Sequence, residues 1–361
     1  DFCLSRGLGD VYKRQVTECT SATKSQQEEA VAAALKKWVR ENRRTISIPG
    51  AIYAVSNARA LGFLNSSNRW TATGLALAYI GRILPPLQGG GTFALRPPEQ
   101  ALYLRNYIAT NGALVINFGQ WLMQHGSATD EQLRIDSVIE ELVVEALDEY
   151  LTIAADIRDR TAIRHARDRL GRSRYSSLTK RHKRYPLIRT MERLGLLEAW
   201  EAGGDRVTIR QDATGRLAAL LREIPDIRSL ETLARRDSLA VAIGRILTQT
   251  KGGALLEGPS PGRLMSDGYR YALDLGLQAC PLVYLDDLLY AFDPGCVGET
   301  RAEGLFQPLH QRMPGEVRFH VDRRGRRAFV LVGREVSQNL EDLLSLPDVI
   351  SSSSAPPRTR D

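Results

Sequence analysis

One basic stretch of the chain concentrates the side chains whose type and spacing could bind another molecule. Between residues 156 and 193, thirteen Arg and Lys side chains face four acidic ones. This local excess of nine positive charges exceeds the net charge of +7 of the whole chain, so the rest of the chain is close to neutral. Clustered cations of this kind neutralise phosphate groups and release their counterions. The stretch therefore predicts a nucleic-acid contact.

Hydroxyl groups lie among these cations, and such groups often bond phosphate oxygens and fix the register of a protein on a duplex. The cations also continue beyond Arg172 into the turn where a DNA-recognition segment would begin. The residues predicted to contact DNA in this stretch are Arg172, Arg174, Tyr175, Ser177, Thr179, Lys180, Arg181, Lys183, Arg184 and Arg189. The alternative is a solvated helix face whose arginines pair with acidic residues of the preceding helix.

A second basic cluster lies at the tip of a predicted β-hairpin. Residues 316–321 and 327–332 alternate between apolar and polar types, as two strands do, around a turn at Asp322 to Gly325. The tip offers four further predicted DNA contacts, which are Arg323, Arg324, Arg326 and Arg327. Arginine is favoured in a narrow minor groove. The alternative is a hairpin tip that is charged for solubility alone.

Gly258-Pro259-Ser260-Pro261-Gly262 has the letters of the nucleophile elbow G-x-S-x-G. The oxyanion hole of such an elbow uses the backbone N–H of the residue after the serine. Pro261 has no backbone N–H, and no strand is predicted before the motif. The stretch is therefore interpreted as a loop and not as a hydrolase site.

Tyr284-Leu285-Asp286-Asp287 resembles the Y-x-D-D turn of reverse transcriptases, in which paired aspartates hold two metal ions. That chemistry needs a further aspartate on a separate strand, and helices are predicted around this segment instead. Asp286 and Asp287 are expected in the first turn of a helix, where acidic side chains interact favourably with the helix dipole. A metal-dependent nucleotidyl transferase at this pair is the remote alternative.

The sequence offers little support for other chemistry. It contains no G-x-x-x-x-G-K-[ST] motif, and its four cysteines and five histidines lack metal-ligand spacing. No apolar run approaches the roughly 20 residues of a membrane helix. We therefore expect a protein without enzymatic activity, cofactor, metal or membrane partner, located in the cytoplasm and associated with the nucleoid.

Apolar periodicity predicts a mainly α-helical chain with short β-hairpins. Helices are expected at residues 26–43, 51–64, 75–84, 99–111, 113–125, 264–275, 285–292 and 300–312, with helical connections between 225 and 250 and a short strand within 45–50. A capping box of Thr129 and Gln132 is expected to open a long helix. The apolar seam of that helix, from Ile135 to Ala154, would pack inside its own domain or form a dimer seam.

One helix end occurs twice in the chain. Leu61-Gly62-Phe63-Leu64 and Leu194-Gly195-Leu196-Leu197 are each followed by a predicted strand pair, and then by Thr-Gly at the start of another helix. The glycine is expected to end the first helix in a left-handed cap, and the threonine to cap the next. The two elements lie 11 residues apart in the first copy and 19 in the second. We interpret them as an internal repeat of one supersecondary unit.

The repeat and the two hairpins resemble the winged helix-turn-helix superfamily. This resemblance implies tandem winged-helix units joined by long helices and, more often than not, binding to duplex DNA. The expected segments are 1–25 (disordered), 26–95 (winged-helix-like), 96–157 (helical connector), 158–225 (basic winged helix), 226–262 (helical linker and loop), 263–335 (winged-helix-like) and 336–361 (short helix and disordered tail). Residues 1–15 resemble translated sequencing-adapter DNA from metagenomic reading frames and are excluded from the fold.

The expected function is that of a bacterial, non-catalytic, duplex-DNA-binding protein. It would serve as a subunit of a larger DNA-transacting or phage-defence assembly, or in transcription regulation. The alternative is a protein–protein adaptor, because winged helices also act as docking modules and fold alone does not determine function. The segment 26–95, with Trp70 and few cations, and the helix at 130–155 are the expected protein contacts, and a homodimer is left open.

Overall fold

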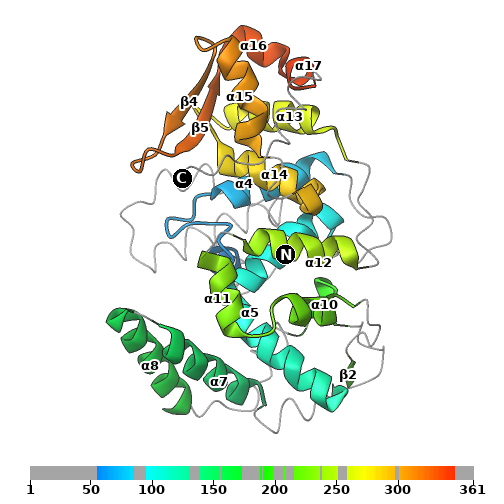
Figure 1. The fold of residues 1–361 in the computed structure, drawn as a ribbon, viewed down its shortest axis with the longest axis vertical. Coiled ribbons are helices and arrows are strands. Elements are labelled where there is room, and N and C mark those ends of the chain that lie inside the picture. The colour runs from blue at the N-terminus through cyan, green and yellow to red at the C-terminus, as the bar shows by residue number, and fades with distance from the viewer. Residues whose placement is uncertain are drawn as a thin grey trace, which may run out of the picture. The chain divides into compact units, whose positions relative to one another are not determined.

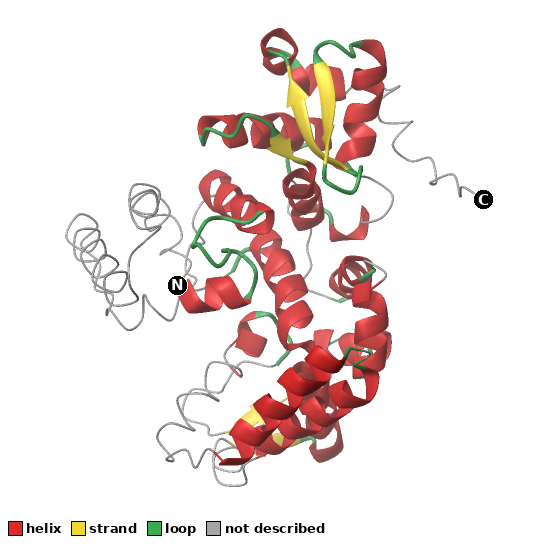
Figure 2. Cartoon of the chain, turned by 90° about the vertical axis from the view of Figure 1, so that its left-hand side faces the viewer, coloured by secondary structure: helices red, strands yellow, loops and turns green. Residues whose placement is uncertain are grey.

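The computed structural model describes residues 55–84, 95–129, 138–154, 156–172, 188, 190–197, 206–208, 215–235, 238–250, 258–296 and 301–345. Over these residues the chain is mostly helical, with few and short strands (Figures 1 and 2). The expected mainly α fold with short β elements is confirmed at this level. The helix and strand expected at 26–43 and 45–50, and the tail at 351–361, lie outside the described residues.

The described chain divides into two compact units. The first compact unit contains the residues up to Leu102 and those from Leu255 onward, and the second contains Tyr103 to Ala254. The described part of the segment 26–95 therefore belongs to the same unit as the segment 263–335. Within this first unit α4 (Ala72–Ile83) packs against α14 (Leu282–Phe292).

The first compact unit contains a three-stranded antiparallel sheet. Its strands are β3 (Cys280–Pro281), β4 (Val317–Val321) and β5 (Arg327–Val332), in the order β3-β5-β4. The hairpin of β4 and β5 is predicted correctly to within one residue. The strand β3 is not predicted, because two residues that include a proline show no alternation.

Helices surround this sheet on its buried side. They are α13 (Pro261–Asp274), α14 and α15 (Ala302–Arg312), followed after the hairpin by α16 (Arg334–Gln338) and α17 (Leu340–Leu344). Tyr269 on α13 joins helix to sheet: its hydroxyl donates to the Val332 carbonyl (3.2 Å) and accepts from the Val332 amide (2.8 Å). The hydroxyl thus links α13 directly to the end of β5.

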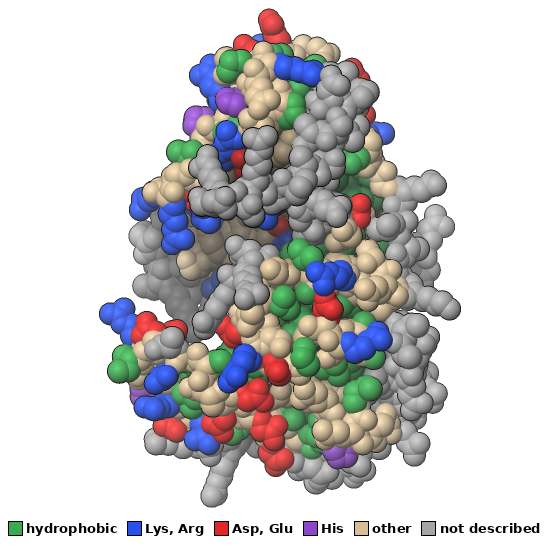
Figure 3. Space-filling model, viewed as in Figure 1, with side chains coloured by type: hydrophobic (Ala, Val, Ile, Leu, Met, Phe, Trp, Pro, Cys, Tyr) green, Lys and Arg blue, Asp and Glu red, His purple; other side chains and the backbone are tan. Residues whose placement is uncertain are grey.

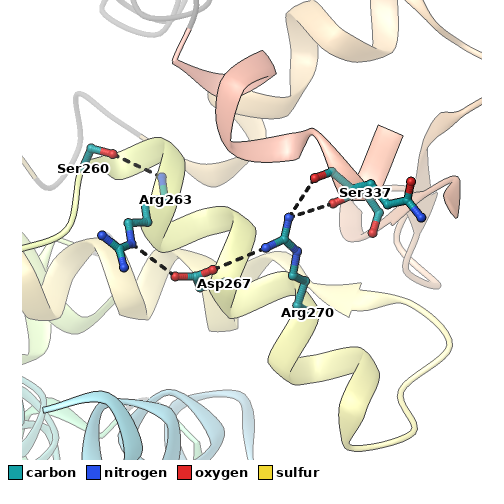
Figure 4. A network of polar contacts seen from close by, with 6 residues as sticks. Ser260, Arg263, Asp267, Arg270 and Ser337 are labelled. Carbon is teal, nitrogen blue, oxygen red and sulfur yellow. Dashed lines mark hydrogen bonds and ion pairs between the residues drawn. The ribbon is translucent and has the colours of Figure 1, made fainter. Parts of the chain in front are cut away.

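A polar network fixes α13 at its start and along its exposed side (Figure 4). The Ser260 hydroxyl accepts a hydrogen bond from the Arg263 amide (3.3 Å), and Pro261 occupies the first helical position, where proline is tolerated. Asp267 lies between Arg263 (3.5 Å) and Arg270 (3.7 Å). Ser260 is therefore a helix cap, and only residues 258–260 of the predicted loop are outside the helix.

The C-terminal end of α16 is held by the same network. Arg270 donates to the carbonyl oxygens of Ser337 (3.3 Å) and Gln338 (3.0 Å), which are among the last carbonyls of α16. These carbonyls have no partner within their own helix. Arg270 satisfies them and ties α16 to α13.

The helix α5 (Pro97–His125) is continuous over 29 residues. The prediction of two helices interrupted near Gly112 is wrong. A Cβ atom at Gly112 would lie 2.7 Å from Cδ2 of Leu230, so this glycine permits close packing between helices and does not end one. A glycine within a helical pattern can mark either a helix end or a site of close packing. The sequence does not distinguish these two roles, whereas the tertiary contacts do.

Over its described residues the second compact unit contains a two-stranded sheet and several further helices. The strand β1 (Ser127–Thr129) pairs antiparallel with β2 (Arg206–Thr208), with Thr129 opposite Arg206. The helices are α7 (Val138–Ile153), α8 (Ile157–Arg172), α10 (Arg216–Glu223), α11 (Ile227–Arg235) and α12 (Leu239–Gln249). Thr129 is the last residue of the paired strand β1, and its predicted capping role stays a prediction because Gln132 lies outside the described residues.

The apolar seam of α7 packs inside the second unit. Ala146 is buried together with Ala113 of α5 and Ile227 of α11, and Tyr150 packs against this cluster. The buried positions Val138, Ile139, Leu142 and Ala146 all lie on α7.

The repeated helix end has the same geometry in both copies. Gly62 (φ 72°) and Gly195 (φ 69°) take the left-handed conformation that glycine adopts without strain. The Gly62 amide donates to Arg59 (3.0 Å) and the Gly195 amide to Glu192 (2.9 Å). The same geometry occurs a third time, at Gly276 (φ 83°), which ends α13.

The cap predicted for the helix after the first copy is displaced. The Thr71 hydroxyl, and not that of Thr73, accepts from the Gly74 amide (3.1 Å) and donates to the Gly62 carbonyl (2.6 Å). Gly74 lies so close to Phe63 that a Cβ atom would come within 1.9 Å of its carbonyl oxygen. In the second copy Gly215 precedes the first residue of α10, and Thr214 lies outside the described residues.

Candidate nucleic-acid interface

The tip of the β4–β5 hairpin is fixed by Asp322. One carboxylate oxygen, Oδ1, accepts hydrogen bonds from the backbone amides of Arg324 (2.8 Å) and Arg326 (3.0 Å). Gly325 (φ 75°) supplies the left-handed position and donates to the Asp322 carbonyl (3.0 Å). Aspartate and glycine at these places are what such a turn requires. The hydrogen bonds, that from Arg326 first, lower the pKa of Asp322.

The four predicted arginines of the tip have different surroundings. Arg326 contacts the other carboxylate oxygen of Asp322 through Nε (3.1 Å) and Nη2 (3.0 Å). The guanidinium groups of Arg323 and Arg324 form no hydrogen bond or ion pair with any residue that the structure describes, and both residues are exposed. These two cations are therefore available to a ligand, whereas Arg326 is shared with Asp322.

Arg327 points toward α15. Its Nη1 lies 3.0 Å from Oε1 of Glu303 and is hydrogen-bonded to Gln307, and its Cζ lies 4.5 Å from the centroid of the Phe319 ring. The His310 ring meets the same Phe319 ring edge-on, with centroids 5.3 Å apart. The predicted contact at Arg327 thus belongs to the junction between hairpin and helix.

The outer face of the hairpin adds a cation, Arg318, and an imidazole ring, His320, that the sequence reasoning missed. Arg318 and His320 are exposed on β4, and their side chains lie on the opposite face from the buried Val317. The signal was present in the alternation of β4, which places these two residues on one face. Lys and Arg side chains gather around the hairpin in the space-filling view (Figure 3).

The helix α15 presents a mixed face to solvent. Its first turn carries Glu303, and Gln311 and Arg312 are exposed at its end. The His310 Nδ1 lies 2.7 Å from the Val317 carbonyl, so this ring is used to hold β4. The cations of this region are therefore concentrated on the hairpin and not on α15.

Asp286 and Asp287 lie in the corner between α14 and α15. Because α14 begins at Leu282, the prediction that they occupy the first turn is wrong. Oδ1 of Asp286 accepts from the Ala302 amide at the start of α15 (2.7 Å). Burial raises the pKa of Asp286 to about 6, although this hydrogen bond acts in the opposite direction. Among the described residues no three His, Cys, Asp or Glu side chains are grouped as metal ligands.

The basic stretch is described over residues 156–172 and again at residues 188 and 190–193. Its helix α8 runs beside α7 (Figure 1) and ends at Arg172, whose side chain is not described. The other predicted contacts lie outside the described residues: Arg174, Tyr175, Ser177, Thr179, Lys180, Arg181, Lys183, Arg184 and Arg189. Their role stays a prediction.

Some of the described arginines of α8 are bound to other residues, and others are exposed without a partner among the described residues. Arg167 pairs with Asp148 of the acidic helix α7 through Nε (2.7 Å) and Nη2 (3.0 Å). This pairing is what the alternative of a solvated helix face predicts. Arg160 donates to the Ala154 carbonyl (2.7 Å). The guanidinium groups of Arg158 and Arg164 contact no other described residue through a hydrogen bond or an ion pair. Between residues 157 and 168 only two side chains are partly buried, so α8 is largely exposed.

Comparison with known families and proteins gives no further guide. No family model, no curated protein and no solved structure matches the chain. Among the helices that the structure describes, none has both the length and the apolar character needed to cross a bilayer.

Proposed function

We propose that the chain binds duplex DNA without catalysing a reaction, and that the β4–β5 hairpin tip makes one of its contacts. The observation that carries the proposal is the pair Arg323 and Arg324. Both guanidinium groups project from a turn that Asp322 fixes, and neither is used by another described residue. Cations held in this way can neutralise phosphates without first losing an internal partner.

The order of elements in residues 261–332 supports this proposal. Three helices, α13, α14 and α15, precede a hairpin with an arginine-rich tip. This is the order of a winged helix-turn-helix, in which the third helix enters the major groove and the hairpin lies beside it. In this interpretation the mixed face of α15 makes few phosphate contacts, and the hairpin contributes most of them.

The exposed arginines of α8 are a second proposed contact. Arg158 and Arg164 lie six residues apart on a helix whose described side chains are almost all exposed. A highly charged helix with so little buried surface gains little from packing. Phosphate contacts by α8 would continue into the predicted recognition segment that follows Arg172. Such a protein would act within a larger DNA-transacting or phage-defence assembly, or in transcription regulation.

A protein–protein adaptor is the second candidate, favoured by the acid at the start of α15 and by the turn after Gly62. There Leu64 and Trp70 form an isolated antiparallel bridge, and the Asn65 side chain accepts from the amides of Ser67 and Arg69 (both 2.9 Å). This short turn carries Arg69 as its one cation. Its surface therefore suits a protein partner better than a phosphate backbone.

Fluorescence anisotropy with a labelled random duplex at several salt concentrations tests the proposal. Each phosphate contact contributes about 0.9 to the slope of log affinity against log salt, so R323A/R324A is expected to reduce the slope by about 1.8. The matched control R59A/R228A removes the same charge from two exposed arginines whose guanidinium groups, like those of Arg323 and Arg324, form no hydrogen bond or ion pair with any described residue. Absence of binding at low salt, or equal slopes for the two variants, contradicts the proposal for the hairpin.

A further inference from the structure

We propose that the outer face of the β4–β5 hairpin binds unpaired bases of a single-stranded nucleic acid, with Phe329 and His320 as the stacking surface. The inference rests on the proposed nucleic-acid contact of this hairpin and names a second ligand class for it. The duplex contact is made by the tip, whereas this surface lies along the strands.

The register of the sheet places the two residues directly opposite each other on neighbouring strands. His320 is the Cα partner of Phe329, and Phe329 is in turn the partner of Pro281 in β3. Side chains of directly opposed residues project on the same face of a sheet. The opposite face is buried, since Val317 and Val330 are both inaccessible to solvent. His320 and Phe329 therefore share the open face, with Phe329 40% exposed.

Phe329 exposes an apolar ring on the open face of this sheet. Among the described residues the large exposed apolar side chains are Ile83, Met123, Ile157, Leu277, Val283, Val321 and Phe329. Of these, Val321 and Phe329 lie on the strands, and Val321 alternates with His320 onto the other face. Phe329 is the one aromatic residue among them.

The charges around this surface select an anionic ligand. The open face of the strands carries Arg318 and no acidic residue, and Arg327 on β5 is already paired with Glu303. The nearest carboxylate on the tip, Asp322, is occupied by Arg326 and by two backbone amides. Arg323 and Arg324 continue the positive surface beyond the strands.

Together, the exposed ring and the nearby cations fit an anionic ligand that has flat apolar faces. Single-stranded nucleic acid is bound by aromatic side chains that stack on bases and by cations that follow the backbone. Phe329 is two strand positions from Arg327, about 7 Å at the rise of a β-strand, and the tip lies just beyond. A base on Phe329 thus has its neighbouring phosphates within reach of the tip arginines. An acidic peptide would use the cations but would gain less from the two rings.

The test uses the full chain and three labelled probes of about 15 nucleotides, namely oligo-dT, oligo-U and a blunt DNA duplex. Phe329→Leu keeps an apolar side chain of similar size and removes the aromatic ring, and Phe329→Trp restores a ring. Val283→Ala is the control, since Val283 is an apolar residue that is 57% exposed at the start of α14, two residues after β3. Circular dichroism confirms that each variant is folded.

Loss of one stacked base is expected to weaken binding of the single strands by about tenfold in F329L. F329W should keep the affinity, V283A should change it by less than about twofold, and duplex binding should be unchanged in F329L. Preference between oligo-dT and oligo-U identifies the kind of strand. Equal affinities of F329L and V283A for both single strands, or a wild-type chain that binds the duplex alone, overturn the inference and leave the proposed duplex contact standing. If F329L weakens single-strand binding while R323A/R324A leaves duplex binding intact, the duplex contact fails instead.

Discussion

The guanidinium of Arg327 joins the β4–β5 hairpin to α15 by lying 3.0 Å from the Glu303 carboxylate while covering the Phe319 ring. The hairpin is thereby attached to the helix next to the tip that carries the unpaired arginines. The sequence predicts Arg327 as a DNA contact together with the other tip arginines, but in the structure its side chain holds the hairpin against α15.

Replacing Arg327 by Ala should therefore lower the free energy of unfolding. The pair is partly exposed, with side chains 35% and 46% accessible, so the ion pair contributes at most about 1 kcal/mol. The cation–π contact adds roughly 0.5 kcal/mol. Urea denaturation of R327A, E303A and the double variant measures the coupling between the two residues. A coupling energy of zero would show that they act independently.

Gly74→Ala should destabilise the protein although alanine favours helices. The new Cβ atom would meet the Phe63 carbonyl oxygen, a backbone atom that cannot move aside without disturbing the Gly62 helix end. Overpacking of this kind costs about 1–3 kcal/mol, which exceeds the gain of roughly 1 kcal/mol in helix propensity.

Thermal denaturation compares G74A with Gly315→Ala. Gly315 has no atom within 4 Å of its virtual Cβ and no positive φ, so G315A should leave the melting temperature nearly unchanged. Equal melting temperatures for the two variants would contradict the close approach of α4 to Phe63.

Asp286 should make the stability of the protein depend on pH. Burial raises its pKa to about 6 from its ordinary value of 3.8, so the folded protein binds a proton more tightly than the unfolded chain. The stabilisation from this proton is complete below about pH 4 and is lost as the pH rises through about 6.

Asp286→Asn removes the charge and keeps an oxygen that can accept from the Ala302 amide. D286N should be more stable than the wild-type chain at pH 7, by about 3 kcal/mol, and similar to it at pH 4. Urea denaturation at both pH values measures the difference. A variant that is less stable at pH 7 would indicate that the ionised carboxylate stabilises the corner between α14 and α15.

Two substitutions of Asp322 that remove the same charge test whether an ordered hairpin turn contributes to DNA binding. Asp322→Asn and Asp322→Ala both remove the negative charge, but only Asn keeps an oxygen for the Arg324 and Arg326 amides. Loss of an ordered turn should make D322A bind duplex DNA about fivefold more weakly than D322N, as expected for about one hydrogen bond. Anisotropy at one salt concentration measures both. Identical affinities would mean that the order of the tip does not contribute to binding.

Local patterns predicted the hairpin, and long-range contacts decided how its residues are used. Alternation and an Asp-Gly turn locate β4 and β5 within one residue, because both signals lie within adjacent positions of the chain. Which arginine is paired depends on Glu303, which comes from another helix and leaves no local signal. For the same reason the two-residue strand β3 and the close packing at Gly112 were missed.

Helix ends show the same division. The left-handed glycines at 62 and 195 were predicted from the residues around them, because a glycine after a leucine at a helix end is a local signal. The sequence pattern does not predict that Thr71 rather than Thr73 caps the helix, because the Thr71 hydroxyl also donates to the Gly62 carbonyl nine residues before it. The third copy at Gly276 was missed because Gln278 takes the place of the final apolar residue.

The exposed arginines of α8 provide a test that does not involve the hairpin. Arg158 and Arg164 contact no other described side chain, whereas Arg167 is held by two bonds to Asp148. If α8 contacts phosphates, R158A/R164A should reduce the salt slope of duplex binding by about 1.8, the same change as R323A/R324A. R167A should change it by much less, since its charge is already compensated by Asp148. A larger effect of R167A than of R158A/R164A would indicate that the helix pair α7–α8 is needed for structure and that its exposed cations do not meet DNA.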